Sequence, residues 1–239
     1  MALVPVSRSI CEATRRLALL PPTAALLVLV VACGSDEEAN TSQNTTAAAS
    51  ATQSASFPSL PTLATCPAPS GTAPEVQVKS YPQRPALTID PTHQFIAHVY
   101  TTRGHFIMQL LPDLAPEHVN SFVFLARDKF FNGTVFHRVE PGFVVQGGDP
   151  TGTGRGGPGY TVPLEASQEP FVRGVLGMAR SNDPNSAGSQ WFVTLGDAPH
   201  LNGQYTVFGK VVQGMDIVDC IQVGDSIIDL AIQEIAPGG

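Results

Sequence analysis

The chain has 239 residues, with 13 lysines and arginines against 20 aspartates and glutamates, and a formal net charge of −7. This length allows one or two domains. The sequence has no basic run and no ribbon of base-stacking aromatics, and its acidic balance repels phosphate backbones, so nucleic acid is excluded as a partner.

Residues 1–32 are typical of an export signal rather than of folded structure. Three arginines within the first sixteen residues precede an apolar run at 17–32, which Pro21 and Pro22 interrupt. The run is sixteen residues long, whereas a helix that spans a membrane needs about 20 apolar residues. We therefore predict a signal peptide that is removed, in preference to a permanent transmembrane anchor.

The end of this signal, Val-Val-Ala-Cys at residues 30–33, resembles the lipobox of bacterial lipoproteins, in which the cysteine carries the lipid. An ordinary secretory signal is the alternative, but polar sequence begins directly after Cys33, which favours the lipoprotein form. The resemblance implies export and a lipid anchor in the bacterial cell envelope, with the rest of the chain on the extracytoplasmic side. Because the chain is acidic, we expect membrane attachment to depend on lipidated Cys33 rather than on anionic lipid.

Residues 33–90 are predicted to be a disordered tether, rich in Ser, Thr, Ala, Asn, Gln and Pro, that cannot bury enough apolar surface to fold. Its last third is proline-rich and favours extended conformations. After loss of the signal and lipidation of Cys33, the cysteines that remain are Cys66 and Cys220. Their pairing stays open, because an oxidising compartment favours a disulfide while Cys66 lies in the tether and Cys220 in a predicted helix.

Residues 91–239 are the part that can fold. Runs at 95–101 and 105–110 around Gly104 predict a β-hairpin. Pro116 opens a stretch with apolar residues at helical spacing, which predicts a helix. Two short strands flank the Pro141-Gly142 turn, and a short helix at 215–221 and a closing strand at 227–235 follow. Many short strands with only two substantial helices indicate an antiparallel barrel rather than alternating βαβ units.

Several motifs in this part do not carry chemistry. Residues 152–157 match the dinucleotide fingerprint G-x-G-x-x-G, but Pro158-Gly159 cannot open the helix that the fingerprint needs, so we predict a surface loop. The six histidines lack ligand-like spacing, so no metal site is expected. Ser189 is not in a nucleophile elbow and is read as a loop residue. Trp191 is predicted to pack in the core.

The stretch FHRVEPGFVVQGGD at residues 136–149 places a guanidinium, a carboxamide and apolar side chains on two strand-like runs. It resembles the signature of cyclophilin-type peptidyl-prolyl cis/trans isomerases. GMA at 177–179 with PNSAGSQWF at 184–192, and LNGQYTVFGKV at 201–211, resemble the next two blocks of that family in order and spacing. The resemblance covers roughly residues 94–235. It implies a mainly β fold, a closed eight-stranded antiparallel β-barrel capped by two helices, with the active site on its outer face.

The resemblance also implies which residues act on an X-Pro bond, a reaction that requires no cofactor. The catalytic set is Arg138, Phe143, Gln146 and Phe192. The substrate-binding set is Phe136, Val144, Ala179, Arg180, Gln190, His200, Leu201 and Tyr205. Without the flanking blocks, Arg138 would be read as one half of a surface ion pair with Glu140. The expected partners are proline-containing peptides and unfolded exported proteins.

The sequence departs from the family pattern in two respects. Val144 stands where methionine is frequent, and the valine makes the pocket slightly smaller but keeps it apolar. Tyr205 replaces a common histidine, and His200 occupies the position of a tryptophan that contacts cyclosporin, so we expect weak cyclosporin binding. A non-catalytic module that binds proline-containing segments is the alternative function, although the retained catalytic set favours an enzyme. A solute-binding lipoprotein is disfavoured because the two-lobed α/β pattern is missing.

Overall fold

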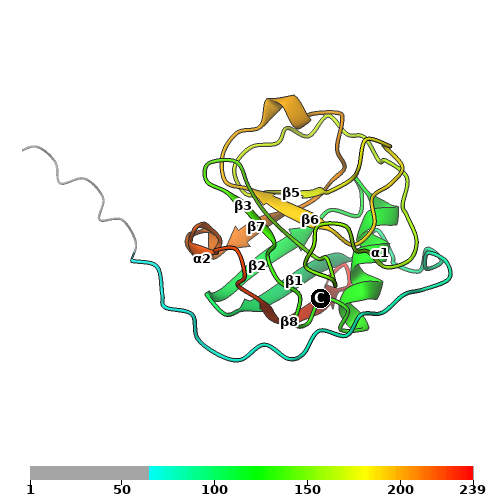
Figure 1. Ribbon diagram of the computed structural model, residues 1–239. Helices are drawn as coiled ribbons and strands as arrows, with labels where there is room; N and C mark the ends of the chain where they lie inside the picture. The colour runs from blue at the N-terminus through cyan, green and yellow to red at the C-terminus, as the bar shows by residue number, and fades with distance from the viewer. Residues whose placement is uncertain (1–64, 239) are drawn as a thin grey trace, which may run out of the picture. The chain divides into compact units, whose positions relative to one another are not determined.

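The computed structural model describes residues 65–238 of the chain (Figure 1). In this part, short strands follow one another with two α-helices between them. The strands are β1 Gln94–Thr101, β2 Gly104–Leu110, β3 Arg138–Glu140, β4 Val144–Gly147, β5 Val175–Met178, β6 Trp191–Thr194, β7 Val207–Gln213 and β8 Ile227–Ile235. The helices are α1 Pro116–Arg127 and α2 Met215–Cys220, with a 3₁₀ turn at Pro199–Leu201.

The strands form one antiparallel sheet in the order β3-β4-β6-β5-β7-β2-β1-β8. The prediction of a closed barrel is wrong, because β3 and β8 are the two edges and the sheet is an open half-barrel. β3 has only three residues before the Pro141-Gly142 turn, too few to form a ladder with the nine residues of β8. Backbone hydrogen bonds between residues 133–136 and 224–227 cross the opening near the start of β8.

The predicted hairpin is confirmed as β1 and β2, which pair from Phe95 with Leu110 to Thr101 with Gly104. Along β1 the side chains alternate, so that Phe95, Ala97 and Val99 are buried. This alternation is the period of two that a strand with one face on a core requires. β8 pairs with the other edge of β1, which confirms the predicted closing strand.

Both predicted helices are confirmed. α1 has Pro116 in its opening turn, where the missing N–H costs nothing. Its apolar side chains, including Phe122 and Leu125, are buried against the sheet. α2 is a short helix that ends at Cys220.

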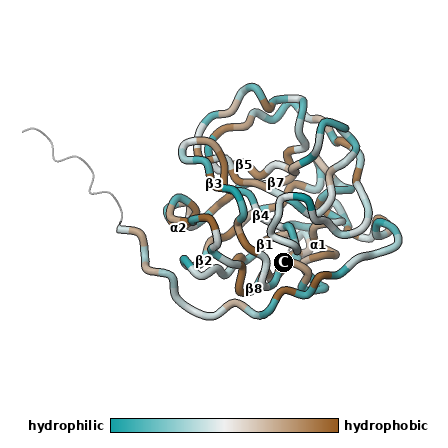
Figure 2. The backbone as a smooth tube through the Cα atoms, viewed as in Figure 1, coloured by the Kyte–Doolittle hydropathy of each residue, from teal (hydrophilic) through white to brown (hydrophobic). Residues whose placement is uncertain are grey.

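The concave side of the half-barrel is filled by its own side chains, and Figure 2 shows hydrophobic stretches running through the strands. Trp191 is fully buried and packs edge-to-face on Phe122 and Phe136, so its predicted packing role is confirmed. A second apolar cluster lies apart from this core and supports the site described below. It consists of Val144, Phe171, Val175, Phe192, Ala198, Leu201 and Val207.

Residues 65–90, which we call the N-terminal strap, belong to the predicted tether but lie along the folded domain. In Figure 1 this cyan segment runs from α2 beneath β8 to α1. Its first anchor is a disulfide between Cys66 and Cys220, which resolves the pairing that the sequence leaves open. At the other end the Thr88 N–H donates to Asn120 Oδ1 across 3.0 Å.

The rest of the predicted tether, residues 33–64, and the signal with Cys33 lie outside the described residues. Within 65–238, no helix combines the length and hydropathy that crossing a membrane requires.

Candidate active site

A pocket of about 640 Å³ opens on the outer face of the sheet, over β4 and β6. Ten of the twelve residues predicted to catalyse or to bind substrate line it. They are Arg138, Phe143, Val144, Gln146, Ala179, Arg180, Phe192, His200, Leu201 and Tyr205. Residues as far as 67 apart in sequence, Arg138 and Tyr205, thus meet in one place, as the three sequence blocks imply. We call this the proline pocket.

Strand pairing places the two polar groups of the pocket side by side. Arg138 in β3 is directly opposite Gln146 in β4, so their side chains share one face of the sheet. Arg138 Nη1 donates a hydrogen bond to Gln146 Oε1 across 3.1 Å. Gly142 supports this register with a φ of +74°, which closes the turn between the strands at no steric cost.

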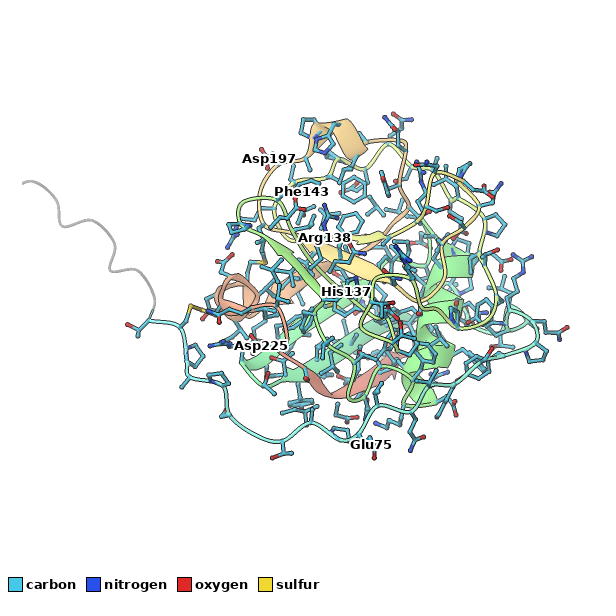
Figure 3. All side chains as sticks on the ribbon, in the orientation of Figure 1. Glu75, His137, Arg138, Phe143, Asp197 and Asp225 are labelled. Atoms are coloured by element: carbon cyan, nitrogen blue, oxygen red, sulfur yellow. A yellow bond between two sulfur atoms is a disulfide. The ribbon has the colours of Figure 1, made fainter. Side chains whose placement is uncertain are left out.

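Arg138 also forms the ion pair with Glu140 that the sequence would predict without the flanking family blocks. Its Nε and Nη2 lie 2.9 and 2.7 Å from Glu140 Oε1, because residues two apart in a strand face the same way. Its guanidinium carbon lies 5.7 Å from the centre of the Phe143 ring, and Figure 3 shows the two side chains near one another. The Arg138 side chain is 44% exposed, so Glu140 orients the cation while one side stays open to the pocket.

A chain of amides holds Gln146 in place. Its Nε2 donates to Gln190 Oε1 across 3.0 Å, and Gln190 Nε2 donates to the carbonyl of Gly156 across 2.9 Å. Gln146 therefore presents its oxygen toward Arg138 and the proline pocket. Gln190 lies behind it and lines the neighbouring pocket instead.

The floor of the proline pocket is apolar and tightly packed. Phe192, Val144 and Leu201 are all buried. The Phe192 ring rests on Phe171, with ring centres 5.7 Å apart. Position 177 must be glycine here, because a Cβ on Gly177 would overlap the Phe192 ring. The site thus offers a small apolar cavity beside a cation.

The rim carries aromatic rings of mixed polarity. The ring centres of His200 and Phe143 lie 5.3 Å apart. Tyr205 stands edge-on to Phe192 at 6.1 Å. Since His200 and Tyr205 border the pocket, weak cyclosporin binding stays a prediction that rests on these two positions.

His137 lines the same pocket, although sequence reasoning did not assign it a role. Burial lowers its pKa, and the charge of Arg138 lowers it further, while Asp149 acts in the opposite direction. The imidazole is therefore neutral near pH 7 and adds no second charge beside Arg138.

Phe136 is not brought to the pocket. Its backbone N–H donates to the carbonyl of Asp225 across 2.9 Å, at the point where the chain crosses the opening of the sheet. The ring turns inward, is fully buried and packs on Trp191. Phe136 is therefore a core residue, and its place in the predicted substrate-binding set is not supported by this geometry.

The glycine-rich stretch at 152–157 is a loop with no helix after it, as predicted. Two of its residues, Thr153 and Gly154, line the proline pocket, which periodicity could not reveal. Ser189 is buried and donates to the carbonyl of Gly148 across 2.6 Å. Within residues 65–238, no cluster of three or more His, Cys, Asp or Glu side chains could hold a metal ion.

Comparison with known proteins shows the family to which the chain belongs. Residues 96–233 match the family model of cyclophilin type peptidyl-prolyl cis-trans isomerases. A probable peptidyl-prolyl cis-trans isomerase of Brucella suis is 49% identical over 142 residues, 54% of this chain and 72% of the relative. Peptidyl-prolyl cis-trans isomerase B of Bacillus subtilis is 43% identical over 140 residues, 54% of this chain and 97% of the relative.

Among solved structures, a cyclophilin type peptidyl-prolyl cis-trans isomerase of Cryptosporidium parvum, crystallised in the presence of the dipeptide Ala-Pro, is similar with a TM-score of 0.54. It is 31% identical, and the match covers 58% of this chain and 98% of that one. The family model spans more than half of the chain, and the Brucella and Bacillus relatives are covered over most of their length. The chain therefore belongs to the cyclophilin-type peptidyl-prolyl cis-trans isomerases and is an enzyme that interconverts the cis and trans forms of X-Pro bonds.

Proposed function

We propose that the enzyme isomerises X-Pro bonds of exported proteins at the bacterial cell envelope, with the prolyl ring in the proline pocket and Arg138 beside the bond that rotates. One observation carries the assignment of roles. Arg138 and Gln146 stand opposite each other across β3 and β4, at the edge of an apolar pocket floored by Phe192.

The reaction is purely kinetic. Rotation about a peptide bond meets a barrier of ~18–20 kcal/mol, whereas the two isomers of X-Pro differ by only about 0.5–1 kcal/mol. No bond is made or broken, so the reaction requires neither a nucleophile nor a redox group. Lowering the barrier by ~7 kcal/mol accelerates exchange by about five powers of ten.

Each part of the pocket has a role in reaching the twisted state. As amide resonance is lost, a lone pair develops on the proline nitrogen, and the Arg138 guanidinium stabilises it more than it stabilises the planar ground state. The Gln146 Nε2 group carries a second hydrogen besides the one that it donates to Gln190, and this hydrogen donates to the carbonyl of the substrate. Val144, Phe192 and Leu201 exclude water and grip the ring, so that rotation is confined to one side of the bond.

Proline-containing peptides are the substrates that this pocket fits. The structure of the Cryptosporidium relative in the presence of Ala-Pro supports this class of ligand. Unfolded exported proteins expose such segments before they fold, and the slow exchange of X-Pro bonds limits their folding.

The envelope location is supported by the sequence around Cys33 and by a feature of the folded domain. The disulfide between Cys66 and Cys220 fits an oxidising compartment outside the cytoplasm. With Cys33 lipidated, about thirty residues of sequence would separate the membrane anchor from the strap.

Cell fractionation tests the location. The wild-type chain is expected in the membrane fraction with a lipid on Cys33 that mass spectrometry detects, and Cys33→Ala is expected in the soluble extracytoplasmic fraction. Recovery of both proteins in the same fraction would refute the anchor. The isomerase activity is tested separately, by NMR exchange on a proline peptide.

A further inference from the structure

A second pocket, of about 670 Å³, adjoins the proline pocket. We call it the side pocket. Its walls are the loop at 154–161 and parts of the segment from 179 to 190, namely residues 179–181, 186 and 188–190, and Ser80 of the strap also reaches it. Gln146, Gly154, Ala179 and Arg180 line both pockets, so a peptide in the proline pocket continues directly into this one.

The charged side chains that line the side pocket are positive. Among residues 65–238, the only charged residues that line it are Arg155 and Arg180, and no carboxylate of this part of the chain does so. This is unusual for a chain with seven more acidic than basic residues. The local field therefore favours an anion, although the net charge of the protein is negative.

Most other cations of the described residues are paired with carboxylates, whereas these two arginines are not. Residues 65–238 contain ten lysines and arginines, and seven of them form ion pairs with carboxylates. Arg155, Arg180 and Lys210 are the three without such a pair in the described residues. Two of these three line the side pocket, whereas Lys210 lines a different pocket, which Glu169 also lines.

Arg180 is held in place by neutral groups only. Its Nε donates to the carbonyl of Gln204 across 3.0 Å, and its Nη1 to that of Ser181 across 2.8 Å. Its guanidinium carbon lies 4.4 Å from the centre of the Tyr205 ring. These contacts fix the direction of the guanidinium and leave its charge uncompensated.

Two carboxylates on the same segments of chain do not neutralise the pair. Asp149 is fully buried behind the glycine-rich loop, where its oxygens accept hydrogen bonds from Thr151 and Gly156. Asp183 follows Arg180 on the same loop, but it is exposed and its Oδ1 accepts from the backbone of Asn185. Neither lines the side pocket.

We infer that the side pocket binds an acidic side chain of the substrate, and that Arg155 and Arg180 make the enzyme favour X-Pro sites with Asp or Glu within three residues of the proline. An extended peptide advances ~3.3 Å per residue, so three residues reach about 10 Å into an adjoining pocket. This inference rests on the isomerase function above and adds a substrate class to it.

The test is a set of end-blocked alanine peptides with one central proline. Each carries a single Glu, Gln or Lys at one of the three positions on either side of the proline. NMR exchange gives kcat/KM for each peptide with the intact chain. At the best position we expect Glu to exceed Lys by about tenfold at low ionic strength, the sum of two partly exposed charge interactions. In 1 M salt, where the screening length is ~3 Å, the ratio is expected to fall to about twofold.

The variant Arg155→Gln/Arg180→Gln identifies the source of the preference. The measured quantity is the ratio of kcat/KM for the Glu peptide to kcat/KM for the Lys peptide within one protein, so a general loss of turnover cancels. We expect the ratio to fall below twofold in this variant and to be unchanged in the matched control Lys210→Gln. A wild-type ratio below twofold at all six positions, or a ratio that survives in the double variant, would overturn the inference while leaving the isomerase function intact. If the Gln peptides were not turned over at all, the isomerase function itself would be refuted.

Discussion

Arg138 and Gln146 occupy opposed positions on β3 and β4, and the guanidinium donates to the amide oxygen across 3.1 Å. The contact depends on the register between β3 and β4, because a shift of one residue would place one of the two side chains on the other face of the sheet. The cation and the amide thus reach the proline pocket as a pair, with Glu140 holding one side of the guanidinium and Gln190 holding the amide.

Gln146→Ala is expected to lower kcat/KM for a proline peptide by about tenfold. The variant loses a hydrogen bond to the substrate carbonyl, worth ~1–1.5 kcal/mol, and frees Arg138 Nη1. NMR exchange measures the loss, and Gln109→Ala on the remote strand β2 is the control. Unchanged turnover in Gln146→Ala would show that this amide does not contact the substrate.

Gly177→Ala tests the packing of the pocket floor. Its added Cβ would overlap the Phe192 ring, so the ring must move into the space that the prolyl ring needs. We expect a loss of stability of about 1–3 kcal/mol and a rise in KM. Gly157→Ala is the matched stability control, because a Cβ there meets nothing within 4 Å. Equal melting temperatures for the two variants would contradict the tight packing of the pocket floor around Phe192.

The disulfide between Cys66 and Cys220 is expected to stabilise the domain by about 2–4 kcal/mol, because it closes a long loop in the unfolded chain. A reductant should therefore lower the melting temperature of the wild type. Cys66→Ser should melt at the reduced wild-type temperature with and without reductant, since Cys66 is exposed and its replacement disturbs little else. A wild type that is indifferent to reductant would contradict a stabilising role.

Glu165 links the loop after the side pocket to α1. Burial alone would raise the pKa of Glu165, but hydrogen bonds from the His118 ring and from the backbone N–H groups of Glu117 and His118 outweigh it and hold the pKa below its ordinary value of 4.5. Because the folded pKa is depressed, this stabilisation is fully present above pH 4.5 and is lost as the pH falls through the folded value.

We therefore expect wild-type stability to drop below pH 4.5 more steeply than that of Glu165→Gln. At neutral pH Glu165→Gln should be about 1–3 kcal/mol less stable, since it leaves buried donors with a weaker acceptor. Urea unfolding at a series of pH values measures both effects. The exposed neighbour Glu169 provides the control, and Glu169→Gln should follow the wild-type curve. Parallel curves for Glu165→Gln and the wild type would refute this linkage.

Much of the fold follows from local patterns in the sequence. The alternation of Phe95, Ala97 and Val99 identifies a strand with one buried face, and Pro116 before regularly spaced apolar residues identifies α1. Most of the site follows from the three family blocks, because their spacing brings Arg138, Phe192 and Leu201 to one pocket.

The remaining features depend on contacts between distant segments. The half-barrel stays open because β3 is short, which no periodicity indicates. The composition of the strap predicts a disordered tether. The strap is nevertheless attached to the domain, because Cys66 is bonded to Cys220 and Thr88 to Asn120. Phe136 stands two residues before Arg138, but an irregular backbone bonded to Asp225 turns it into the core.

The most direct test of the central claim compares wild type and Arg138→Ala by NMR exchange on a peptide with one X-Pro bond. The claim that a guanidinium stabilises the twisted bond predicts a fall in kcat/KM of ~10²–10³, the usual loss when one preorganised electrostatic group is removed. Arg138→Lys should recover only part of it, because an ammonium lacks the planar fork, and Arg127→Ala, which breaks an exposed ion pair with Glu234, should exchange at the wild-type rate. Exchange by Arg138→Ala at the wild-type rate would contradict the account.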